Sequence, residues 1–253
     1  MVRKDLEYFI NYFKEDINEL AQVGAHFGQE IQIFDKFDLN QVHLFEPIKE
    51  LKSILLEKTK NKKNYSIHSF ALGNENTNKQ MFYSDENSGQ SSSILEPALH
   101  KKLQPKIKFE KMINIQVKKF IDLNIDNVNF LIMDVQGFEL EVLKGFENKL
   151  KNVRYIFTEV NRNYLYESNV LIKDLDKYLT QFGFLRIWTT WRSADMPWGD
   201  AFYIRKEHIS LYRKFFLFFK NMIFTSKLFF ILYRIFDFRV HKKKLKKYLF
   251  KKS

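Results

Sequence analysis

Short apolar runs alternate with helix-patterned segments through most of the chain. The runs predict seven strands, at residues 17–23, 42–45, 65–71, 128–133, 155–158, 184–189 and 201–204, with a further candidate at 113–117. The segments between them predict helices at residues 28–37, 48–58, 138–150 and 171–182. This alternation favours an α/β fold with a mostly parallel sheet, helices on both faces, and an antiparallel edge formed by the last pair of strands.

A polar segment, ALGNENTNKQMFYSDENSGQSSSILEP, follows the third predicted strand. Its glycines, asparagines and serines predict a long loop, with a short hairpin at residues 80–84. Loops of that length are usually either functional or disordered. We interpret the serines at its end as part of a lid over a site, and a flexible linker is the alternative.

Composition limits the size, the compartment and the chemistry of the protein. A chain of 253 residues with 45% hydrophobic content is long enough for one well-buried domain plus an appendage. It contains no cysteine, which excludes disulfides, cysteine-bound zinc and a thiol nucleophile. The first 20 residues mix acids and bases and lack the apolar core of a secretory signal. We therefore expect a cytoplasmic protein.

The net charge of +12 is concentrated in the tail. Residues 209–253 hold 13 of the 42 basic residues and one of the 30 acidic residues, which leaves 29 of each in residues 1–208. A change of composition near this point divides the chain into a predicted domain at residues 1–206 and a basic, aromatic tail at residues 207–253. The body alone does not have the charge of a nucleic-acid binder.

Two glycines and a glutamate mark the ends of the first two predicted strands. Gly24 and Gly28 follow the first strand, where a glycine lets the backbone turn tightly and approach a ligand. Glu46 ends the second strand, where a carboxylate can accept hydrogen bonds from both ribose hydroxyls. No pyrophosphate-binding glycine motif is present, so the pattern indicates a nucleoside ligand such as S-adenosylmethionine. Ordinary turns that happen to contain glycine are the alternative.

Several motifs make the chain resemble the FkbM family of S-adenosylmethionine-dependent methyltransferases. They cover nearly all of residues 18–206 in the family's order. They are QVGAHFGQE (22–30), VHLFEP (42–47), FALG (70–73), QSSSILEP (90–97), NFLIMDVQGFELEVLKG (129–145), YIFTEVN (155–161) and WGDAFY (198–203).

The resemblance implies a Rossmann-like class I methyltransferase fold that transfers a methyl group to an oxygen of a sugar, a glycan or a related natural product. It also implies a set of cofactor-binding residues. Gln22 is a departure, because many members carry Asp at this position near the methionine amino group. The implied cofactor-binding residues are Gln22, Gly24, Ala25, His26, Gly28, Glu46, Ala71, Leu72, Asp134 and Gln136.

Methyl transfer to an alcohol benefits from a base that removes the hydroxyl proton, by roughly 10²–10⁴-fold. Asp134 and Glu159 end two predicted strands, so both carboxylates should face the same crevice. Either can serve as the base, while Asp134 can instead bind the cofactor or cap the following helix. The sequence does not choose between them.

Further polar residues of the matched motifs are candidates for binding the acceptor substrate. His100 is either a base that reaches over the site or a solvated loop residue. Asp200 could join the two carboxylates on a metal, but no metal is predicted, because there is neither an H-x-x-x-H motif nor a dense acidic cluster. The candidates are Ser91, Ser92, Ser93, His100, Asn161 and Asp200.

The tail spaces its cations at seven-residue intervals, which places them along one face of a helix. They are Arg213, Lys220, Lys227 and Arg234. No run there reaches the roughly 20 apolar residues that a membrane span needs. We expect a peripheral anchor on an anionic inner membrane face. Packing on the body, a homo-oligomer contact and RNA binding are the alternatives.

Two other function classes stay open at this point. One is a non-catalytic membrane- or RNA-binding protein that kept the fold, an alternative that the departure at Gln22 leaves standing. The other is a nucleic-acid methyltransferase, which the neutral body disfavours because the tail alone would have to bind the phosphates.

Overall fold

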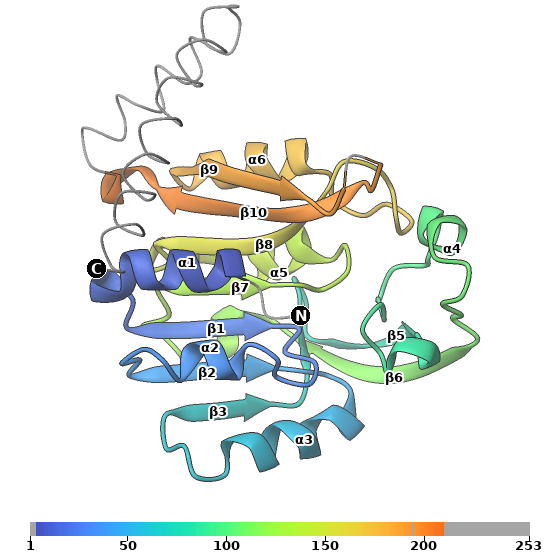
Figure 1. The fold of residues 1–253 in the computed structure, drawn as a ribbon, viewed down its shortest axis with the longest axis horizontal. Helices are drawn as coiled ribbons and strands as arrows, with labels where there is room; N and C mark the ends of the chain where they lie inside the picture. Colours follow the sequence, from blue (N-terminus) through green and yellow to red (C-terminus); the bar gives the residue numbers. More distant parts are fainter. Residues whose placement is uncertain (1–3, 194, 210–253) are drawn as a thin grey trace, which may run out of the picture. The chain divides into compact units, whose positions relative to one another are not determined.

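The computed structural model describes residues 4–193 and 195–209. Its main element is a seven-stranded sheet (Figure 1). The strands follow the order β3 (Tyr65–His68), β2 (Gln41–Phe45), β1 (Glu19–Val23), β7 (Phe130–Met133), β8 (Tyr155–Asn161), β10 (Trp198–Arg205) and β9 (Phe184–Trp191).

The pairing confirms the mostly parallel α/β sheet. The strands from β3 to β8 are paired in parallel, whereas β10 is antiparallel to both β8 and β9. The antiparallel strand is therefore inserted next to the edge, and the edge strand β9 runs in the same direction as β8. All seven residues of β8 are buried, including the polar Thr158, Glu159 and Asn161 in its second half.

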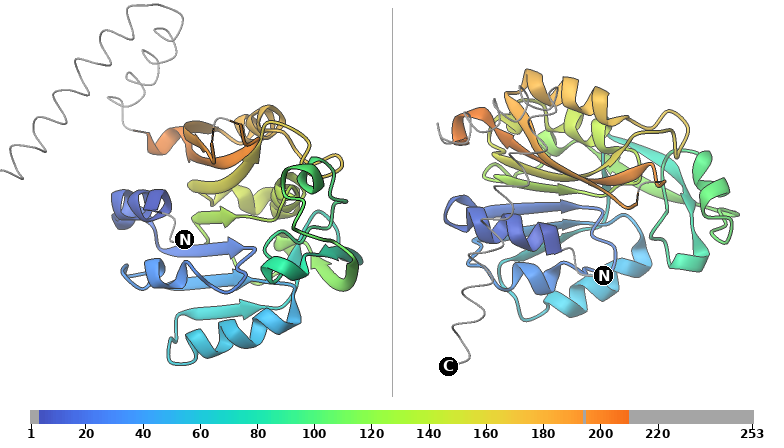
Figure 2. Two further views of the ribbon diagram at one scale, coloured as in Figure 1. Left: turned by 45° about the vertical axis from the view of Figure 1, so that its right-hand side comes forward. Right: turned by 45° about the horizontal axis from the view of Figure 1, so that its top comes forward.

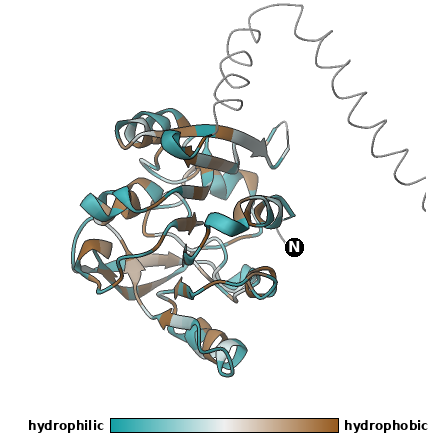
Figure 3. Ribbon diagram, turned by 90° about the vertical axis from the view of Figure 1, so that its left-hand side faces the viewer, coloured by the Kyte–Doolittle hydropathy of each residue, from teal (hydrophilic) through white to brown (hydrophobic). Residues whose placement is uncertain are grey.

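Helices cover both faces of the sheet. One face packs against α1 (Lys4–Phe13), whose Phe9 ring stacks on Phe202 of β10 at a centroid distance of 4.0 Å. Side chains of α5 (Glu139–Phe146) and α6 (Ile172–Gln181) belong to the core on the other face. Figure 3 shows hydrophobic and hydrophilic residues in turn along the helices, as expected for amphipathic elements.

Helix α1 was not predicted from the sequence. Its buried residues Leu6, Phe9, Ile10 and Phe13 have helical spacing, but the exposed Tyr8 and Tyr12 and the charged residues at its start hid the pattern. The predicted helix at residues 28–37 is also wrong in length. The structure keeps only α2 (Ile31–Phe34), because residues 24–30 are used for turns in which Gly24 and Gly28 have positive φ.

A second, three-stranded sheet corrects two further predictions. Its order is β4 (Ala71–Leu72), β6 (Lys111–Lys118) and β5 (Thr77–Tyr83). The predicted strand at 65–71 is therefore two strands in different sheets. The predicted hairpin at 80–84 is wrong, because β5 pairs with β6, about thirty residues later. Figures 1 and 2 show this sheet and α4 (Leu99–Leu103) beyond the carboxyl ends of the main strands.

The remaining helices are α3 (Lys49–Thr59) and five short 3-10 turns. The predicted helix at 138–150 ends as an α-helix at Phe146 and continues as a 3-10 turn, because Glu147 has a φ of +48°. The 3-10 turns are η1 (Lys14–Asp16), η2 (Asp85–Asn87), η3 (Phe120–Asp122), η4 (Glu147–Lys151) and η5 (Lys206–His208).

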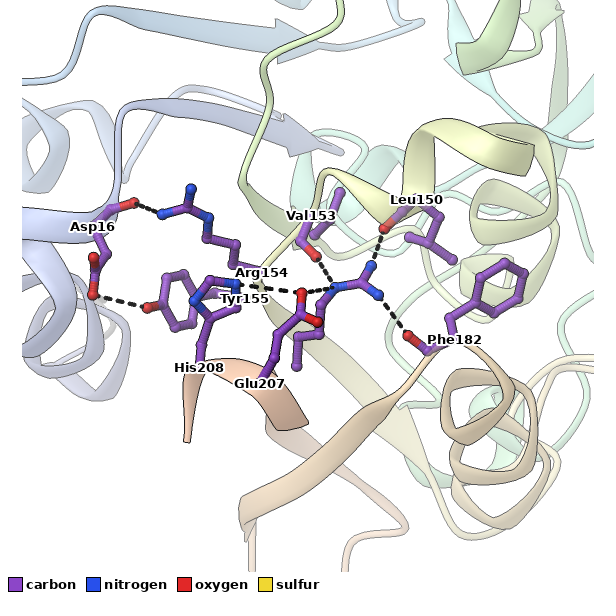
Figure 4. A network of polar contacts seen from close by, with 9 residues as sticks. Asp16, Leu150, Val153, Arg154, Tyr155, Phe182, Glu207 and His208 are labelled. Atoms are coloured by element: carbon purple, nitrogen blue, oxygen red, sulfur yellow. Dashed lines mark hydrogen bonds and ion pairs between the residues drawn. The ribbon is translucent and has the colours of Figure 1, made fainter. Parts of the chain in front are cut away.

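The amino end of β8 and the end of β10 are held by a polar network, shown in Figure 4. The guanidinium of Arg205 donates to the backbone carbonyls of Val153, Phe182 and Leu150 at 3.0, 2.7 and 2.5 Å. The Tyr155 hydroxyl donates to Asp16 at 3.3 Å. These contacts join the ends of η4 and α6 to the last strand, at the end of the sheet opposite to the carboxyl ends of the parallel strands.

Within the described part of the chain, no helix is both long and apolar enough to cross a membrane. The predicted tail, apart from its first three residues, lies outside the described residues.

Candidate active site

The main pocket opens at the carboxyl ends of the strands, where β2 and β7 flank β1. A parallel sheet places its ligand site there because the strand order reverses at this point. The pocket has a volume of about 990 Å³. All but three of the predicted site residues line it: Gln22, Gly24, His26, Glu46, Ala71, Leu72, Ser91, Ser92, Ser93, His100, Asp134, Gln136, Glu159 and Asp200.

The glycine turn after β1 is held against the ends of two neighbouring strands. The backbone amides of Gly24 and Ala25 both donate to the Phe45 carbonyl at 3.0 Å. Gly24 has a φ of +82°, and a Cβ at this position would lie 2.1 Å from the carbonyl oxygen of Asp134. Only glycine therefore allows β1 and β7 to end so close together.

Ala25 and Gly28 support the turn and do not line the pocket. Ala25 is fully buried. A Cβ on Gly28 would lie 2.5 Å from Ile31 and 2.8 Å from Leu55, so this glycine allows α2 and α3 to pack closely. Both residues therefore support the pocket without contacting its interior.

Glu46 directly follows β2, and two hydrogen bonds hold its carboxylate. Its two oxygens accept the backbone amides of His26 at 2.8 Å and Ile48 at 2.9 Å. Burial raises the pKa of Glu46 to about 7, and these two hydrogen bonds oppose the rise. Each oxygen keeps a second lone pair for a ligand hydroxyl.

His26 connects the glycine turn to the polar loop. Burial lowers its pKa, so the ring is neutral near pH 7. In the tautomer that satisfies both contacts, Nε2–H donates to the Ser88 carbonyl and Nδ1 accepts from the Gln29 amide, each at 2.9 Å. His26 itself has a φ of +48°, which makes it part of the tight turn.

Gln22 and Glu30 meet at the end of β1. The Gln22 amide nitrogen donates to a Glu30 carboxylate oxygen at 3.0 Å. Both side chains are buried and both line the pocket. Sequence reasoning missed Glu30, because its side chain reaches back to the strand across the glycine turn.

The two candidate bases are bridged by one amide. The Gln136 amide nitrogen donates to Asp134 at 2.7 Å and to Glu159 at 3.3 Å, and its oxygen accepts from the Tyr166 hydroxyl at 2.8 Å. Burial raises the pKa of Tyr166 well above its usual value, so this hydroxyl stays a donor. The structure thus brings Asp134, Gln136 and Glu159 together, as predicted, and adds Tyr166.

Glu139 holds the turn that presents Gln136. One carboxylate oxygen of Glu139 accepts the backbone amides of Val135 and Gly137, both at 3.2 Å. The residue is fully buried, and burial raises its pKa. Glu139 was not among the predicted site residues, although it lies in the DVQGFE motif. The motif alone does not show whether a carboxylate has a structural or a functional role.

The other half of the pocket has an aromatic and acidic wall. Asp200 of β10 lies opposite Glu159 of β8 in the strand register, and Trp198 lies on the same face of β10 as Asp200. Trp191 of β9, opposite Gly199, also lines the pocket but packs on the core of the other face. Asn161 is fully buried and does not line the pocket. Among the described residues, its side-chain nitrogen and oxygen both lack hydrogen-bond partners.

The three serines shape the polar loop. The Ser93 hydroxyl donates to the Gln136 carbonyl at 2.8 Å, and the Ser92 hydroxyl accepts the Ser84 amide at 3.1 Å. The Ser91 hydroxyl accepts from the Asn87 side chain at 2.7 Å. All three line the pocket while their hydroxyls also hold the loop in its conformation.

His100 lies in α4 and contacts the Tyr166 ring at a centroid distance of 5.5 Å. It is buried rather than solvated, and burial lowers its pKa. Within the described residues, no group of three or more metal-ligating side chains is close enough to hold an ion.

Residues 22–186, more than half of the chain, match the family model of the methyltransferase FkbM domain. The chain belongs to the FkbM methyltransferase family. This confirms the resemblance drawn from the sequence motifs. S-adenosylmethionine is the cofactor of this family domain, in agreement with the prediction.

Individual FkbM-family and other methyltransferases resemble parts of this chain. The 2-O-methyltransferase NoeI of Sinorhizobium fredii (strain NBRC 101917 / NGR234) is 27% identical over 96 residues, which is 36% of this chain and 40% of that protein. The FkbM methyltransferase structure from Methylobacillus flagellatus KT aligns with a TM-score of 0.51 at 16% identity, over 75% of this chain and 44% of that one. This chain therefore matches less than half the length of either relative.

A further solved structure has a lower similarity. Magnesium protoporphyrin IX methyltransferase from Synechocystis PCC 6803, with bound S-adenosylmethionine, has a TM-score of 0.47 at 10% identity, over 80% of this chain and 79% of that one.

The described residues fit S-adenosylmethionine. Glu46 offers a buried carboxylate for the ribose, and Ala71 and Leu72 add an apolar wall from the second sheet. The Gln22 side-chain oxygen is buried and has no hydrogen-bond partner among the described residues, as expected for an atom that awaits a ligand donor. When bound, the cofactor supplies an electrophilic methyl group on a sulfonium.

Proposed function

We propose that this protein is an O-methyltransferase that acts on a hydroxyl of a sugar or glycan. The observation that carries the proposal is the division of one pocket into two chemical halves. The half beside β1 and β2 presents Glu46, and the half beside β8 and β10 presents Glu159, Trp198 and Asp200.

The second half has the chemistry that binds sugars. A sugar ring has apolar C–H faces and a rim of hydroxyls, so it is bound by aromatic side chains together with carboxylates that accept its hydroxyl protons. Trp198 supplies the aromatic surface, and Asp200, on the same face of β10, supplies a carboxylate.

Glu159 is the proposed general base. It lies near the carboxyl end of β8, opposite Asp200, whereas Asp134 directly follows β7 and its backbone lies against the glycine turn after β1. With S-adenosylmethionine bound, the cofactor would supply the methyl group, and Glu159 would take the proton of the acceptor hydroxyl. The Gln136 amide keeps both carboxylates oriented.

The proposal is tested by incubating the full chain with S-adenosylmethionine labelled in its methyl group and a panel of mono- and oligosaccharides. Label should appear on a saccharide, and Glu159→Gln should lower the turnover rate by roughly 10²–10⁴-fold. S-adenosylhomocysteine should still bind to this variant with wild-type affinity. Asp134→Asn should instead weaken that binding.

Transfer to small non-sugar alcohols with no transfer to any saccharide would contradict the proposed substrate class. A Glu159→Gln variant with wild-type turnover would contradict the proposed base. Trp198→Ala should raise the KM for the saccharide and leave cofactor affinity unchanged, because Trp198 lies in the acceptor half, on the face of β10 that carries Asp200.

We also propose that the basic tail holds the enzyme on anionic membranes. The support is the excess of 13 basic residues over one acidic residue in residues 209–253, where each cation adds about 1 kcal/mol near such a surface. Full-length protein should sediment with vesicles containing phosphatidylserine. Deletion of residues 210–253 should abolish this, and unchanged sedimentation would contradict the proposal.

A further inference from the structure

Gln22 is the polar side chain that β1 presents beside the glycine turn. Position 22, at the end of β1, holds a glutamine, and an uncharged amide cannot balance the positive charge of the methionine ammonium. If the ammonium is bound there, another residue must supply the negative charge that balances it.

Glu30 is placed to supply this charge. It precedes α2, and the turn through Gly24 and Gly28 brings its side chain back to the strand. There it accepts a hydrogen bond of 3.0 Å from the Gln22 amide. Glu30 has 8% of its surface exposed and Gln22 has 4%, and both line the pocket.

The hydrogen-bonding atoms of Gln22 support a ligand site that it shares with Glu30. Its amide nitrogen is used on Glu30, so its oxygen is left as the acceptor. That oxygen is buried and has no hydrogen-bond partner among the described residues. An ammonium, with three donors and one positive charge, matches this acceptor and the adjacent carboxylate.

The other acidic residues of the pocket have different surroundings. Both oxygens of Glu46 accept backbone amides. Asp134 and Glu159 share the Gln136 amide. Asp5 lines the pocket from α1 but is exposed.

We propose that Glu30 is the counter-ion of the methionine ammonium of the cofactor, and that Gln22 is a positioning residue that holds it. This inference rests on the S-adenosylmethionine site described above. The negative charge then lies at the start of α2, and the strand residue beside it is neutral.

The binding of two ligands distinguishes a direct contact between Glu30 and the ammonium from a role of Glu30 in maintaining the shape of the pocket. S-adenosylhomocysteine carries the amino-acid group, whereas 5′-methylthioadenosine carries the same nucleoside without it. By calorimetry, Glu30→Gln should weaken binding of S-adenosylhomocysteine by at least about tenfold, which corresponds to the loss of one charge-assisted hydrogen bond. The same variant should bind 5′-methylthioadenosine with wild-type affinity.

The exchange variant Gln22→Asp/Glu30→Gln should recover most of the lost affinity, because it returns one carboxylate to the same pair. Glu57→Gln is the matched control. It removes an exposed carboxylate of α3 that does not line the pocket, so both affinities should stay unchanged.

Equal affinity of wild type and Glu30→Gln for S-adenosylhomocysteine would overturn the inference. An equal loss for both ligands would also overturn it, because it would show that Glu30 only maintains the shape of the pocket. Failure of the folded wild type to bind either ligand would instead overturn the cofactor site itself, so the two failures can be told apart.

Discussion

The carboxylate of Glu46 accepts the backbone amide of His26 at 2.8 Å, and this contact joins the end of β2 to the glycine turn after β1. The group that is expected to bind the ribose therefore also fixes the turn that surrounds the methionine part. Because burial raises the pKa of Glu46 to about 7, the protonation of this residue should control binding.

Cofactor affinity should fall as the pH is lowered through 7. The ionised carboxylate accepts both ribose hydroxyls, whereas the protonated form loses acceptor capacity, so binding must release the proton. The dissociation constant of S-adenosylhomocysteine should rise by up to about tenfold per pH unit below 7 and level off above it. A titration series from pH 5.5 to 8.5 measures this.

Glu46→Gln is the control for this pH dependence. It should bind more weakly at pH 8 and show a nearly flat profile. A wild-type profile that is flat across this range, or a variant that keeps the full slope, would assign the titration to a group other than Glu46.

Gly24→Ala should destabilise the protein much more than Gly183→Ala. Both positions have positive φ, +82° and +80°, which costs an alanine about 1–3 kcal/mol. At Gly24 the new Cβ would also lie 2.1 Å from the Asp134 carbonyl oxygen, whereas at Gly183 nothing lies within 4 Å. Urea unfolding of the two variants isolates this overlap, and equal losses would argue against the close approach of β1 and β7.

Tyr166→Phe should lower turnover without weakening the cofactor complex. The Tyr166 hydroxyl holds the Gln136 amide at 2.8 Å, and that amide orients the two carboxylates. The loss of one hydrogen bond, about 1 kcal/mol, corresponds to a fall in turnover of roughly five- to tenfold. The exposed Tyr164 provides the control variant Tyr164→Phe, which should behave as wild type. A parallel loss of cofactor affinity in Tyr166→Phe would mean that the network supports the other half of the pocket.

Arg205→Met should reduce stability by roughly 2–4 kcal/mol, because it removes a charged donor from three carbonyls at once. Methionine keeps an apolar stem, so the effect reports mainly on the lost hydrogen bonds. Lys14→Met, at an exposed ion pair of 3.9 Å, should change stability by less than about 0.5 kcal/mol. Similar unfolding midpoints for the two variants would show that the network of Figure 4 contributes little.

The sequence predicted the main sheet well because its central strands, β1, β2, β7 and β8, are almost wholly buried and therefore rich in apolar residues. The second sheet was missed because β5 and β6 pair over about thirty residues, and the alternation within each strand gives no sign of its partner. Helix α1 was hidden by its charged residues, although its buried positions have helical spacing.

The site was predicted to the extent that its residues lie in family motifs at strand ends. Gly24, Glu46, Asp134 and Gln136 line the pocket as expected. Glu30, Tyr166 and the two tryptophans were missed, because each reaches the pocket through a turn or a strand pairing that connects distant parts of the chain.

The most direct test of the account is calorimetric titration of S-adenosylhomocysteine into the wild type and the Glu46→Ala variant at pH 8, with folding verified by circular dichroism. The account predicts saturable binding at one site in the wild type and a large loss of affinity in the variant. A folded wild type that does not bind the ligand, or a variant that binds it equally well, would contradict the central claim that this pocket holds the nucleoside of S-adenosylmethionine through Glu46.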